Sequence, residues 1–272
     1  MAGVYIHIPF CKQACVYCNF HFSTNLELKS TIVSAIMKEL EQRKDFLPND
    51  PIETIYFGGG TPSLLTTIEL TSILSSIYES YEVKTNAEIT IEANPDDISL
   101  SFSKELKHIG FNRMSLGIQS FLERDMKYMH RAHTPSQSHH AIDAAQEAGF
   151  ENISIDLIYG IPNTNLNDWK NNLDIIAAKN VQHLSCYALT VEPDTALAYQ
   201  IKSHPQLEPK DADTILQLEY LIHHCKDYGF EQYEISNFSK PGFKSRHNNN
   251  YWQGVYYLGL GPSAHSYNGI SR

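Results

Sequence analysis

Short apolar segments and longer amphipathic segments alternate along the chain. The short segments are rich in β-branched and aromatic residues and span 4–8, 52–57, 87–93, 112–119, 152–160 and 181–189. Each is followed by a segment with apolar residues at helical spacing, namely 26–47, 64–81, 101–110, 133–150, 165–180 and 211–230. The first pattern is typical of strands and the second of helices. Six strand–helix units in series predict a parallel sheet with right-handed crossovers and its helices outside.

Chemically distinctive residues recur at the carboxyl ends of these predicted strands. They are the cysteines after the first strand, the glycines 58–60 after the second, then Glu92, Gln119, Asp156 and the segment 187–190. In barrel-type α/β folds these strand ends meet on one face, where active sites are built. The pattern therefore predicts one site built from six strand ends. Periodicity alone fits both an open sheet and a curved, barrel-like sheet.

The composition is that of an ordinary globular protein. The chain has 272 residues, of which 42% are hydrophobic and 19% charged, and its formal net charge is −10. This acidic balance argues against a nucleic-acid-binding surface. No apolar run approaches the ~20 residues of a membrane span, and the start, MAGVYIHIPF, lacks the features of a signal peptide. We therefore expect a cytoplasmic protein.

Cysteine usage points to a metal centre. Cys11, Cys15 and Cys18 are spaced C-x3-C-x2-C, while Cys186 and Cys225 stand apart in a strand-like and a helix-like segment. An odd, clustered set is unlike the even, dispersed cysteines of a disulfide framework. Thiolates bind zinc or iron–sulfur clusters. Cys186 and Cys225 are expected to be small buried apolar residues.

Both kinds of metal centre remain open from the spacing. Zinc needs four ligands, which His7 or His21 would complete, but structural zinc sites usually pair two short ligand motifs and this chain has one. A 4Fe–4S cube held by three cysteines leaves one iron free for a small molecule. The spacing favours the cluster.

Several polar residues at the predicted strand ends suit a small-molecule ligand. The stretch from Gly58 to Pro62 follows a strand as a phosphate loop does, but no Gly-Lys-Ser/Thr follows it, which argues against a P-loop. Its glycines would instead let backbone carbonyls approach an ammonium group. Glu92 can accept hydrogen bonds from hydroxyls, and Arg131 can pair with a carboxylate.

The C-x3-C-x2-C motif directly after a first strand resembles the radical S-adenosylmethionine (SAM) superfamily. The resemblance implies a partial (β/α)6, TIM-like barrel with a 4Fe–4S cluster. It also implies that the amine and carboxylate of SAM chelate the open iron, and that reduction of the cluster cleaves SAM to a radical. The protein would place the reactants while the cofactors supply the chemistry.

The likeness extends along the whole chain. The stretches YIHIPFC, FGGGTPSLL, IEANPDDI, GIQSF, RAHT, IDLIYGIP, YALTVEPDTAL, HNNNYW and GLGPSAHS together resemble the oxygen-independent coproporphyrinogen III oxidase group. In the oxidase the motif is C-x3-C-x2-C-x-C, whereas Phe20 stands at the last position here. HNNNYW, from His247 to Trp252, is similar to the H-N-x-x-Y-W signature of the haem-chaperone branch. Both differences point to that branch.

The resemblance implies roles for individual residues. Cys11, Cys15 and Cys18 match the cluster ligands, and Tyr5, Gly59 and Glu92 match the residues around the SAM on the cluster. The positions that contact a second SAM in the oxidase, a space that haem would take in the chaperone, are Tyr17, Gly60, Thr61, Gln119, Arg131, Asp156 and Ala188. His247 is a candidate haem-contacting residue, with packing or hydrogen bonding as the alternative.

Residues 1–235 are expected to form the radical SAM core, and 236–272 the start of a C-terminal region that continues in relatives of this group. The first functional hypothesis is a haem chaperone, without coproporphyrinogen oxidase activity, that binds a 4Fe–4S cluster, SAM and haem. It would transfer haem to haem-requiring proteins, including membrane respiratory enzymes. The cluster would serve assembly, a homodimer, or a radical step that frees haem. The second is an anaerobic coproporphyrinogen III oxidase, and the third a zinc-stabilised barrel with neither activity.

Overall fold

The computed structural model describes residues 1–48 and 50–272. In this part of the chain, nine strands form one sheet in the order β7-β8-β6-β5-β4-β3-β2-β1-β9. The strands are β1 (Ala2–Ile8), β2 (Ile52–Gly59), β3 (Val83–Ala93), β4 (Arg113–Gln119), β5 (Ile153–Tyr159), β6 (His183–Ala188), β7 (Glu231–Gln232), β8 (Asn237–Ser239) and β9 (Tyr256–Leu260). Strands β1 to β6 are parallel neighbours in chain order, which confirms the six predicted units.

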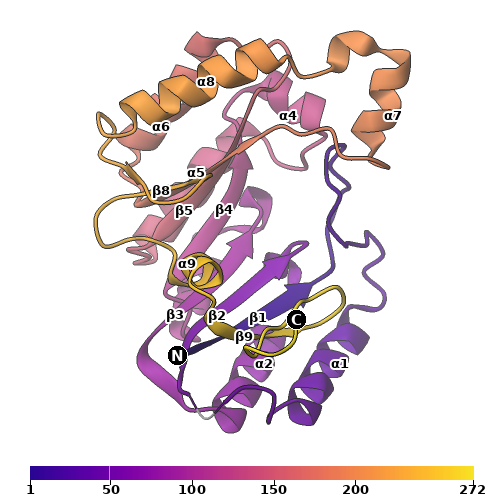
Figure 1. Cartoon of the computed structure of the whole chain (residues 1–272), viewed down its shortest axis with the longest axis vertical. Coiled ribbons are helices and arrows are strands. Elements are labelled where there is room, and N and C mark those ends of the chain that lie inside the picture. The colour runs from indigo at the N-terminus through magenta and orange to yellow at the C-terminus, as the bar shows by residue number, and fades with distance from the viewer. Residues whose placement is uncertain (49) are drawn as a thin grey trace.

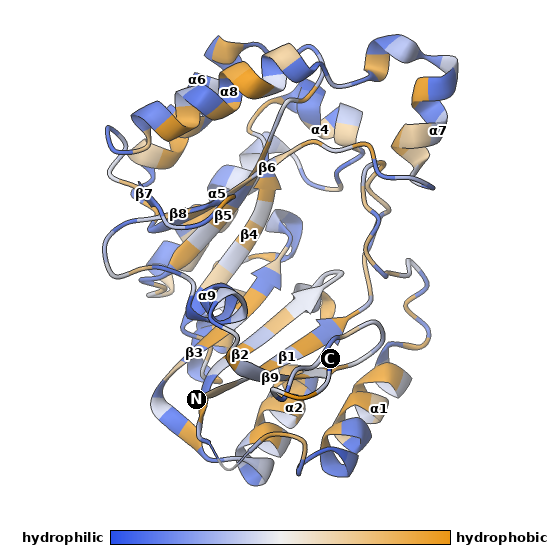
Figure 2. Ribbon diagram, in the orientation of Figure 1, coloured by the Kyte–Doolittle hydropathy of each residue, from blue (hydrophilic) through white to orange (hydrophobic). Residues whose placement is uncertain are grey.

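The helices follow the strands and, apart from α9, lie outside the curved sheet (Figure 1). They are α1 (Lys29–Gln42), α2 (Thr67–Ser80), α3 (Leu100–His108), α4 (Glu123–Met129), α5 (Pro135–Glu147), α6 (Leu166–Ala178), α7 (Ala196–Ser203), α8 (Asp211–His224) and α9 (Arg246–Trp252). Apolar and polar residues alternate around α6 and α8, as Figure 2 shows. Their apolar sides pack on the outer face of β5, where the Tyr159 ring lies 5.7 Å from the Trp169 ring of α6.

The sheet does not close into a full barrel. Its ends are β7 and β9, and β9 pairs with β1 in parallel while β8 runs antiparallel to β6. This open arrangement confirms the expected α/β class and the partial barrel. Strands β8 and β9 come from the range 236–272 and join the same sheet as the core, and the division of the chain at 235 stays a prediction.

The inner face of the sheet is unusually polar for a barrel. Aliphatic side chains fill the interior of an ordinary TIM barrel. Here the inward positions of the six parallel strands are Tyr5, His7, Thr54, Tyr56, Glu88, Thr90, Glu92, Arg113, Ser115, Ser154, Asp156, His183 and Ser185, most of them buried. Burying polar groups is costly unless they are hydrogen-bonded. Such a lining is therefore typical of a ligand-binding interior rather than of a packed core.

Helix α9 lies against this inner face near β2 and β3 (Figure 1). The Glu88 carboxylate of β3 accepts hydrogen bonds from the backbone N–H groups of Arg246 and His247, both at 3.1 Å. Ser245 caps the helix by accepting from the Asn248 N–H at 3.3 Å. Asparagine-rich sequences form helices poorly on their own. The HNNNYW segment is therefore helical because β3 holds its first turn.

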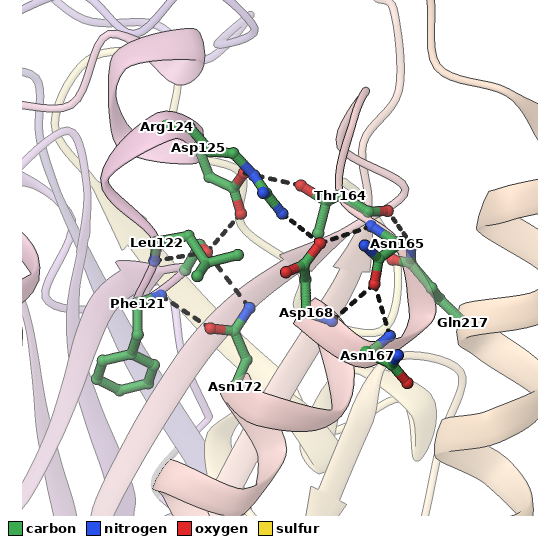
Figure 3. Close-up of polar contacts among 11 residues, drawn as sticks. Phe121, Leu122, Arg124, Asp125, Thr164, Asn165, Asn167, Asp168, Asn172 and Gln217 are labelled. Atoms are coloured by element: carbon green, nitrogen blue, oxygen red, sulfur yellow. Dashed lines mark hydrogen bonds and ion pairs between the residues drawn. The ribbon is translucent and has the colours of Figure 1, made fainter.

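A buried polar network fixes α4 to its neighbours (Figure 3). The Asp125 carboxylate, which is 1% exposed, accepts from Ser120 Oγ at 2.6 Å and from Thr164 Oγ1 at 2.7 Å. Asn172 of α6 donates to Ser120 Oγ at 3.3 Å, and Gln217 of α8 donates to the Thr164 carbonyl at 2.8 Å. Burial raises the pKa of Asp125, although both hydroxyls lower it. The network connects the segments after β4 and β5 with α6 and α8, and so anchors the first turn of α4, which contains Asp125.

Candidate functional site

The three clustered cysteines lie on the irregular segment that follows β1. Cys11, Cys15 and Cys18 are all free and partly buried. This segment passes close to the end of β2, where the Gly60 N–H donates to the Ile8 carbonyl at 2.8 Å. A Cβ atom on Gly60 would lie 2.7 Å from the Phe10 carbonyl oxygen. Glycine at this position therefore lets the cysteine segment approach the glycine triplet.

The thiols of the three cysteines influence one another. Burial raises the pKa of Cys11, and the nearby thiols of Cys18 and Cys15 raise it further, while a hydrogen bond from Thr61 at 3.5 Å lowers it. Burial also raises the pKa of Cys18. The Arg131 guanidinium donates to Cys15 Sγ at 3.1 Å and favours the thiolate forms. Three mutually repelling thiolates are stable together only around a positive centre, which a soft metal supplies.

The residues present fit an iron–sulfur cluster better than a zinc ion. His7 is unsuited as a fourth ligand, because its Nε2 donates to the His21 carbonyl at 2.9 Å and its Nδ1 meets the Tyr5 hydroxyl at 3.2 Å. A tetrahedral zinc with bonds of about 2.3 Å needs its sulfurs within about 4 Å of each other. No set of three or more metal-binding side chains in residues 1–48 and 50–272 converges around one such point. A cluster spreads its thiolate ligands over several irons.

The cysteine segment is held by a distant turn at the end of α4. Gln13 Nε2 donates to the His130 carbonyl at 2.8 Å, and His130 Nδ1 donates to the Ala14 carbonyl at 2.9 Å. The Val16 N–H donates to the Met129 carbonyl at 3.2 Å. His130 is left-handed, with φ 56°, a conformation that glycine adopts more readily. These contacts order the cysteine segment from 116 residues away along the chain.

Replacing His130 with glycine should loosen the cysteine segment without unfolding the protein. Glycine relieves the left-handed backbone but removes the imidazole that holds Ala14. Lys12 is the one lysine or arginine in residues 9–28, so trypsin cleavage after it reports on this segment. We expect cleavage about 5-fold faster than in the wild type, as the loss of one modest hydrogen bond implies. Asn163→Gly, at another left-handed residue with φ 65°, is the control and should leave this rate unchanged. Equal rates in His130→Gly and the wild type would contradict the role given to the imidazole.

The expected SAM residues Tyr5, Gly59 and Glu92 lie on the neighbouring strands β1, β2 and β3, with Gly59 and Glu92 at the carboxyl ends and Tyr5 in mid-strand. The Gly59 N–H donates to Glu92 Oε2 at 3.2 Å, and the Tyr56 hydroxyl donates to Glu92 Oε1 at 2.7 Å. Tyr5 stacks on Tyr56 with 6.1 Å between ring centroids. Burial raises the pKa of Glu92 to about 7. This carboxyl group can therefore exist in either protonation state near neutral pH.

The sequence pattern predicts a strand over residues 52–57 but does not indicate that Tyr56 belongs to the site. Tyr56 occupies an inward position two residues before the glycine triplet. Strand alternation carries that signal, because residues two apart face the same side. The direct contact with Glu92 needed the register between β2 and β3, which places Tyr56 beside Thr90.

Gln119, Arg131 and Asn94 meet at the ends of β3 and β4. Arg131 Nη2 donates to Asn94 Oδ1 and to the Gly117 carbonyl, both at 2.8 Å, while its Nη1 reaches Cys15. Gln119 is left-handed, with φ 68°. Its amide lies 3.1 Å from where a Cβ on Gly117 would be. Gly117 therefore leaves room for the Gln119 amide and for the Arg131 guanidinium, which reaches Cys15.

Of the remaining expected site residues, Thr61, Tyr17 and Asp156 lie among polar groups, whereas Ala188 packs on the apolar core. Thr61 is buried and lies between Cys11 and Asn94, whose Nδ2 donates to it at 3.4 Å. Tyr17 lies beside Cys15 and Arg131. Burial raises the pKa of its phenol, the charge of Arg131 lowers it, and Cys15 raises it. Asp156 accepts from Ser115 Oγ at 3.2 Å, and burial raises its pKa. Ala188 ends β6 and packs against the main apolar core rather than taking part in a polar contact.

His247 lies deeper in the inner face and is 2% exposed. Its Nδ1 meets Thr54 Oγ1 at 2.8 Å, and its Nε2 meets the Tyr251 hydroxyl at 3.0 Å. The ring stacks on Tyr56 at 5.0 Å and 28°. Burial lowers the pKa of His247 to about 3, so the ring is neutral. These contacts describe a packed, hydrogen-bonded histidine, and haem contact by this residue stays a prediction.

Comparison with known proteins places this geometry in a family. The radical SAM superfamily profile matches residues 5–176. Among helices of the described residues, none has the length and apolar character needed to span a membrane. The chain is similar over 98% of its length to a solved structure titled "Coproporphyrinogen III oxidase (HemN) from Escherichia coli is a Radical SAM enzyme", with a TM-score of 0.83 and 23% identity, and covers 65% of that chain. This likeness supports the fold.

Two curated relatives are similar in sequence over nearly the whole chain, and both are named "Heme chaperone HemW". The protein from Mycobacterium tuberculosis (strain CDC 1551 / Oshkosh) is 35% identical over 274 residues, which are 99% of this chain and 70% of the relative. The protein from Bacillus subtilis (strain 168) is 35% identical over 281 residues, which are 100% of this chain and 72% of the relative. The chain thus belongs to the radical SAM superfamily, on the HemW branch of the oxygen-independent coproporphyrinogen III oxidase group.

Proposed function

We propose that the chain is a haem chaperone, which binds haem and transfers it to haem-requiring proteins. The observation that carries this proposal is the 35% identity to heme chaperone HemW proteins over 99% or more of the chain. The polar inner face of the partial barrel supports it, because a ligand-binding interior needs such groups. The proposed acceptors include membrane respiratory enzymes, and the proposed location is the cytoplasm, which suits five free cysteines.

Membership of the radical SAM superfamily implies a 4Fe–4S cluster and SAM. We assign the cluster to Cys11, Cys15 and Cys18, which leaves one iron for the amine and carboxylate of SAM. When bound and reduced, the cluster supplies an electron for the cleavage of SAM. The role of this chain's residues is to hold the thiolates, to exclude water from them, and to orient SAM. A further proposed role of the cluster is to support a homodimer.

The residues around SAM follow from the contacts at the strand ends. Glu92 would accept hydrogen bonds from SAM, since each of its oxygens has one donor and retains capacity for another. Gly59 donates to Glu92, and Tyr5 lies on β1 beside Tyr56, the other donor to Glu92. We assign the space lined by Tyr17, Gly60, Thr61, Gln119, Arg131, Asp156 and Ala188 to haem or to a second SAM. The Arg131 guanidinium would pair with a carboxylate there, and haem and SAM both carry carboxylates.

His247 is a separate case within this proposal. Both of its ring nitrogens are engaged, with Thr54 and Tyr251. To ligate haem iron through Nε2, the ring would have to exchange the Tyr251 hydroxyl for the metal and open a path from the surface. Tyr251 is 44% exposed, so α9 is the side from which haem would approach this histidine.

Coproporphyrinogen III oxidase activity is the second candidate. The observation that favours it is the structural likeness to HemN, with a TM-score of 0.83. Against it stands Phe20, which occupies the position of the oxidase's fourth cysteine and is 68% exposed. An exposed phenylalanine at this place can bind an apolar ligand but neither a metal nor a proton.

A haem titration is the experiment that tests the proposal. Anaerobically reconstituted protein is titrated with haem, followed by visible spectroscopy, and an apo-haemoprotein is then added as acceptor. We expect saturable binding and transfer to the acceptor. A parallel anaerobic assay with coproporphyrinogen, SAM and reductant should give no protoporphyrinogen. Absence of saturable haem binding, or measurable protoporphyrinogen, would overturn the proposal, and zinc without iron and sulfide would support the third hypothesis.

A further inference from the structure

We propose that Tyr56 is a positioning residue for SAM, whose phenol holds the Glu92 carboxylate in one fixed orientation. This inference rests on the proposed assignment of Glu92 to SAM. It adds a residue that the family motifs in the sequence did not mark.

The Glu92 carboxylate accepts one hydrogen bond on each of its two oxygens. The Tyr56 hydroxyl donates to Glu92 Oε1 at 2.7 Å, while the Gly59 N–H donates to Glu92 Oε2 at 3.2 Å. An O–H donor close to a carboxylate is among the stronger hydrogen bonds of proteins. With one donor on each oxygen, the carboxylate plane is fixed from both sides. Each oxygen keeps the capacity to accept one further hydrogen bond, which a ligand could donate.

The first glycine of the triplet makes room for this pair. A Cβ atom on Gly58 would lie 2.9 Å from Tyr56 Cε1 and 3.1 Å from Glu92 Cδ. Any larger side chain would push the phenol and the carboxylate apart. The other two glycines serve different neighbours, since a Cβ on Gly59 would meet the His7 ring and one on Gly60 the Phe10 carbonyl. Gly58 is therefore matched to the contact between Tyr56 and Glu92.

The Tyr56 ring packs against two other rings, Tyr5 and His247, which also pack against each other at 6.3 Å between centroids. Tyr5 stacks on it with 6.1 Å between centroids, and His247 with 5.0 Å, each at 28° between planes. His247 is in turn fixed by its hydrogen bond to Thr54 and by α9. Tyr56 is only 7% exposed. This packing restricts the Tyr56 ring, and His247 of α9 therefore supports the proposed SAM site.

The hydrogen bond also affects the charge of Glu92. The titratable and charged groups that face it are Tyr5 of β1, Tyr56 of β2, Arg113 of β4, Asp156 of β5, Tyr187 of β6 and Tyr251 of α9. Burial raises the pKa of Glu92 and Asp156 adds to this, while the bonds from Tyr56 and Gly59 and the charge of Arg113 lower it, with a balance at about 7. Without the phenol the pKa would rise further, and less carboxylate would be present at neutral pH.

Tyr56→Phe is the test, since it removes the hydroxyl and keeps the ring. SAM binding to the cluster-loaded protein is measured by anaerobic equilibrium dialysis from pH 6 to 9. We expect SAM binding about 10-fold weaker at pH 7, the effect of one hydrogen bond to a charged group, and a pH midpoint of binding that moves upward. Tyr81→Phe is the matched control, because it removes a hydroxyl that donates to the Arg43 carbonyl at 3.3 Å away from the site. It should bind SAM as the wild type does.

Two further variants separate the outcomes. Glu92→Gln should weaken SAM binding and abolish its pH midpoint, and Gly58→Ala should weaken binding by displacing the Tyr56 ring. If Glu92→Gln weakens binding while Tyr56→Phe matches the wild type in affinity and midpoint, the inference about Tyr56 is overturned and the SAM assignment of Glu92 stands. If Glu92→Gln binds SAM as the wild type does, the SAM assignment of Glu92 and the inference about Tyr56 are both overturned. Iron and sulfide content, measured for every variant, shows whether the fold and cluster are intact, and Gly58→Ala serves as the test if Tyr56→Phe does not fold.

Discussion

Replacing Cys11 with serine should abolish the iron–sulfur cluster. Three thiolates are the full set that the cysteine segment offers, and a serine hydroxyl stays protonated where a thiol would ionise. Two thiolates cannot hold the cube against loss of its irons. Anaerobically reconstituted wild-type protein should contain about four irons and four acid-labile sulfides per chain, as a 4Fe–4S cluster requires. The variant should contain almost none and lack the brown colour of the cluster.

Cys225→Ser is the control for this experiment. Cys225 is buried at the end of α8, and its thiol donates to the Ile222 carbonyl at 3.4 Å, a contact that serine can also make. This variant should bind a full cluster. A full cube in Cys11→Ser would refute the ligand assignment. Loss of the cluster in both variants would mean that folding, not ligation, is what the substitutions disturb.

Acidification should remove the stability that His247 contributes. Burial lowers the pKa of His247 to about 3, while an unfolded histidine has a pKa of about 6.5. Below pH 6.5 the unfolded chain therefore binds a proton that the folded protein does not. The free energy of unfolding falls with pH in this range, by about 2 kcal/mol between pH 7 and pH 5 for this one residue.

Other buried groups shift the stability in the opposite direction. Burial raises the pKa of Glu92 to about 7, so the folded protein binds its proton before the unfolded chain does. That carboxyl group destabilises the fold as the pH rises toward 7. The pH dependence of the wild type alone is thus a sum of opposed contributions. The difference between the wild type and a His247 variant isolates the histidine.

Urea unfolding of the wild type and of His247→Gln at pH 7 and pH 5 measures this difference. Glutamine retains hydrogen-bonding capacity toward Thr54 or Tyr251 but does not titrate. The substitution should lower the free energy of unfolding at pH 7. The difference between wild type and variant should be about 2 kcal/mol smaller at pH 5 than at pH 7. His223→Gln, on the exposed surface of α8, is the control and should lower the free energy of unfolding only slightly at pH 7. An equal cost of His247→Gln at pH 5 and pH 7 would contradict a buried, neutral histidine.

Much of the fold was predictable because its signals are local. The six strand–helix units follow from apolar periodicity within short windows, and the strand ends agree with the structure to within about two residues for β4, β5 and β6. Helix α1 is shorter than the predicted range 26–47 and begins at Lys29. Helices α4 and α9, of seven residues each, are too short to show a clear period. Such helices depend on contacts with the rest of the protein.

The candidate site was likewise predictable only where its signals are local in the sequence. The cysteine spacing and the polar residues at the strand ends were visible because their order along the chain matches their order in a parallel sheet. Two hydrogen bonds, from Arg131 to Cys15 and from His130 to the Ala14 carbonyl, could not be predicted from the sequence, since each joins segments 116 residues apart. Tyr56 was missed because a tyrosine in a strand looks like a core residue until its neighbour on β3 is known.

The sequence by itself determined the α/β class, the six repeating units, and a three-thiolate motif at the end of the first strand. Each of these depends on the order and spacing of residues close together in the chain. Only the tertiary structure decided that the sheet stays open, that β9 pairs with β1, that HNNNYW is a helix held by Glu88, and that Tyr56 meets Glu92. These features depend on strand register and side-chain packing between distant segments, and such contacts leave no period in the sequence.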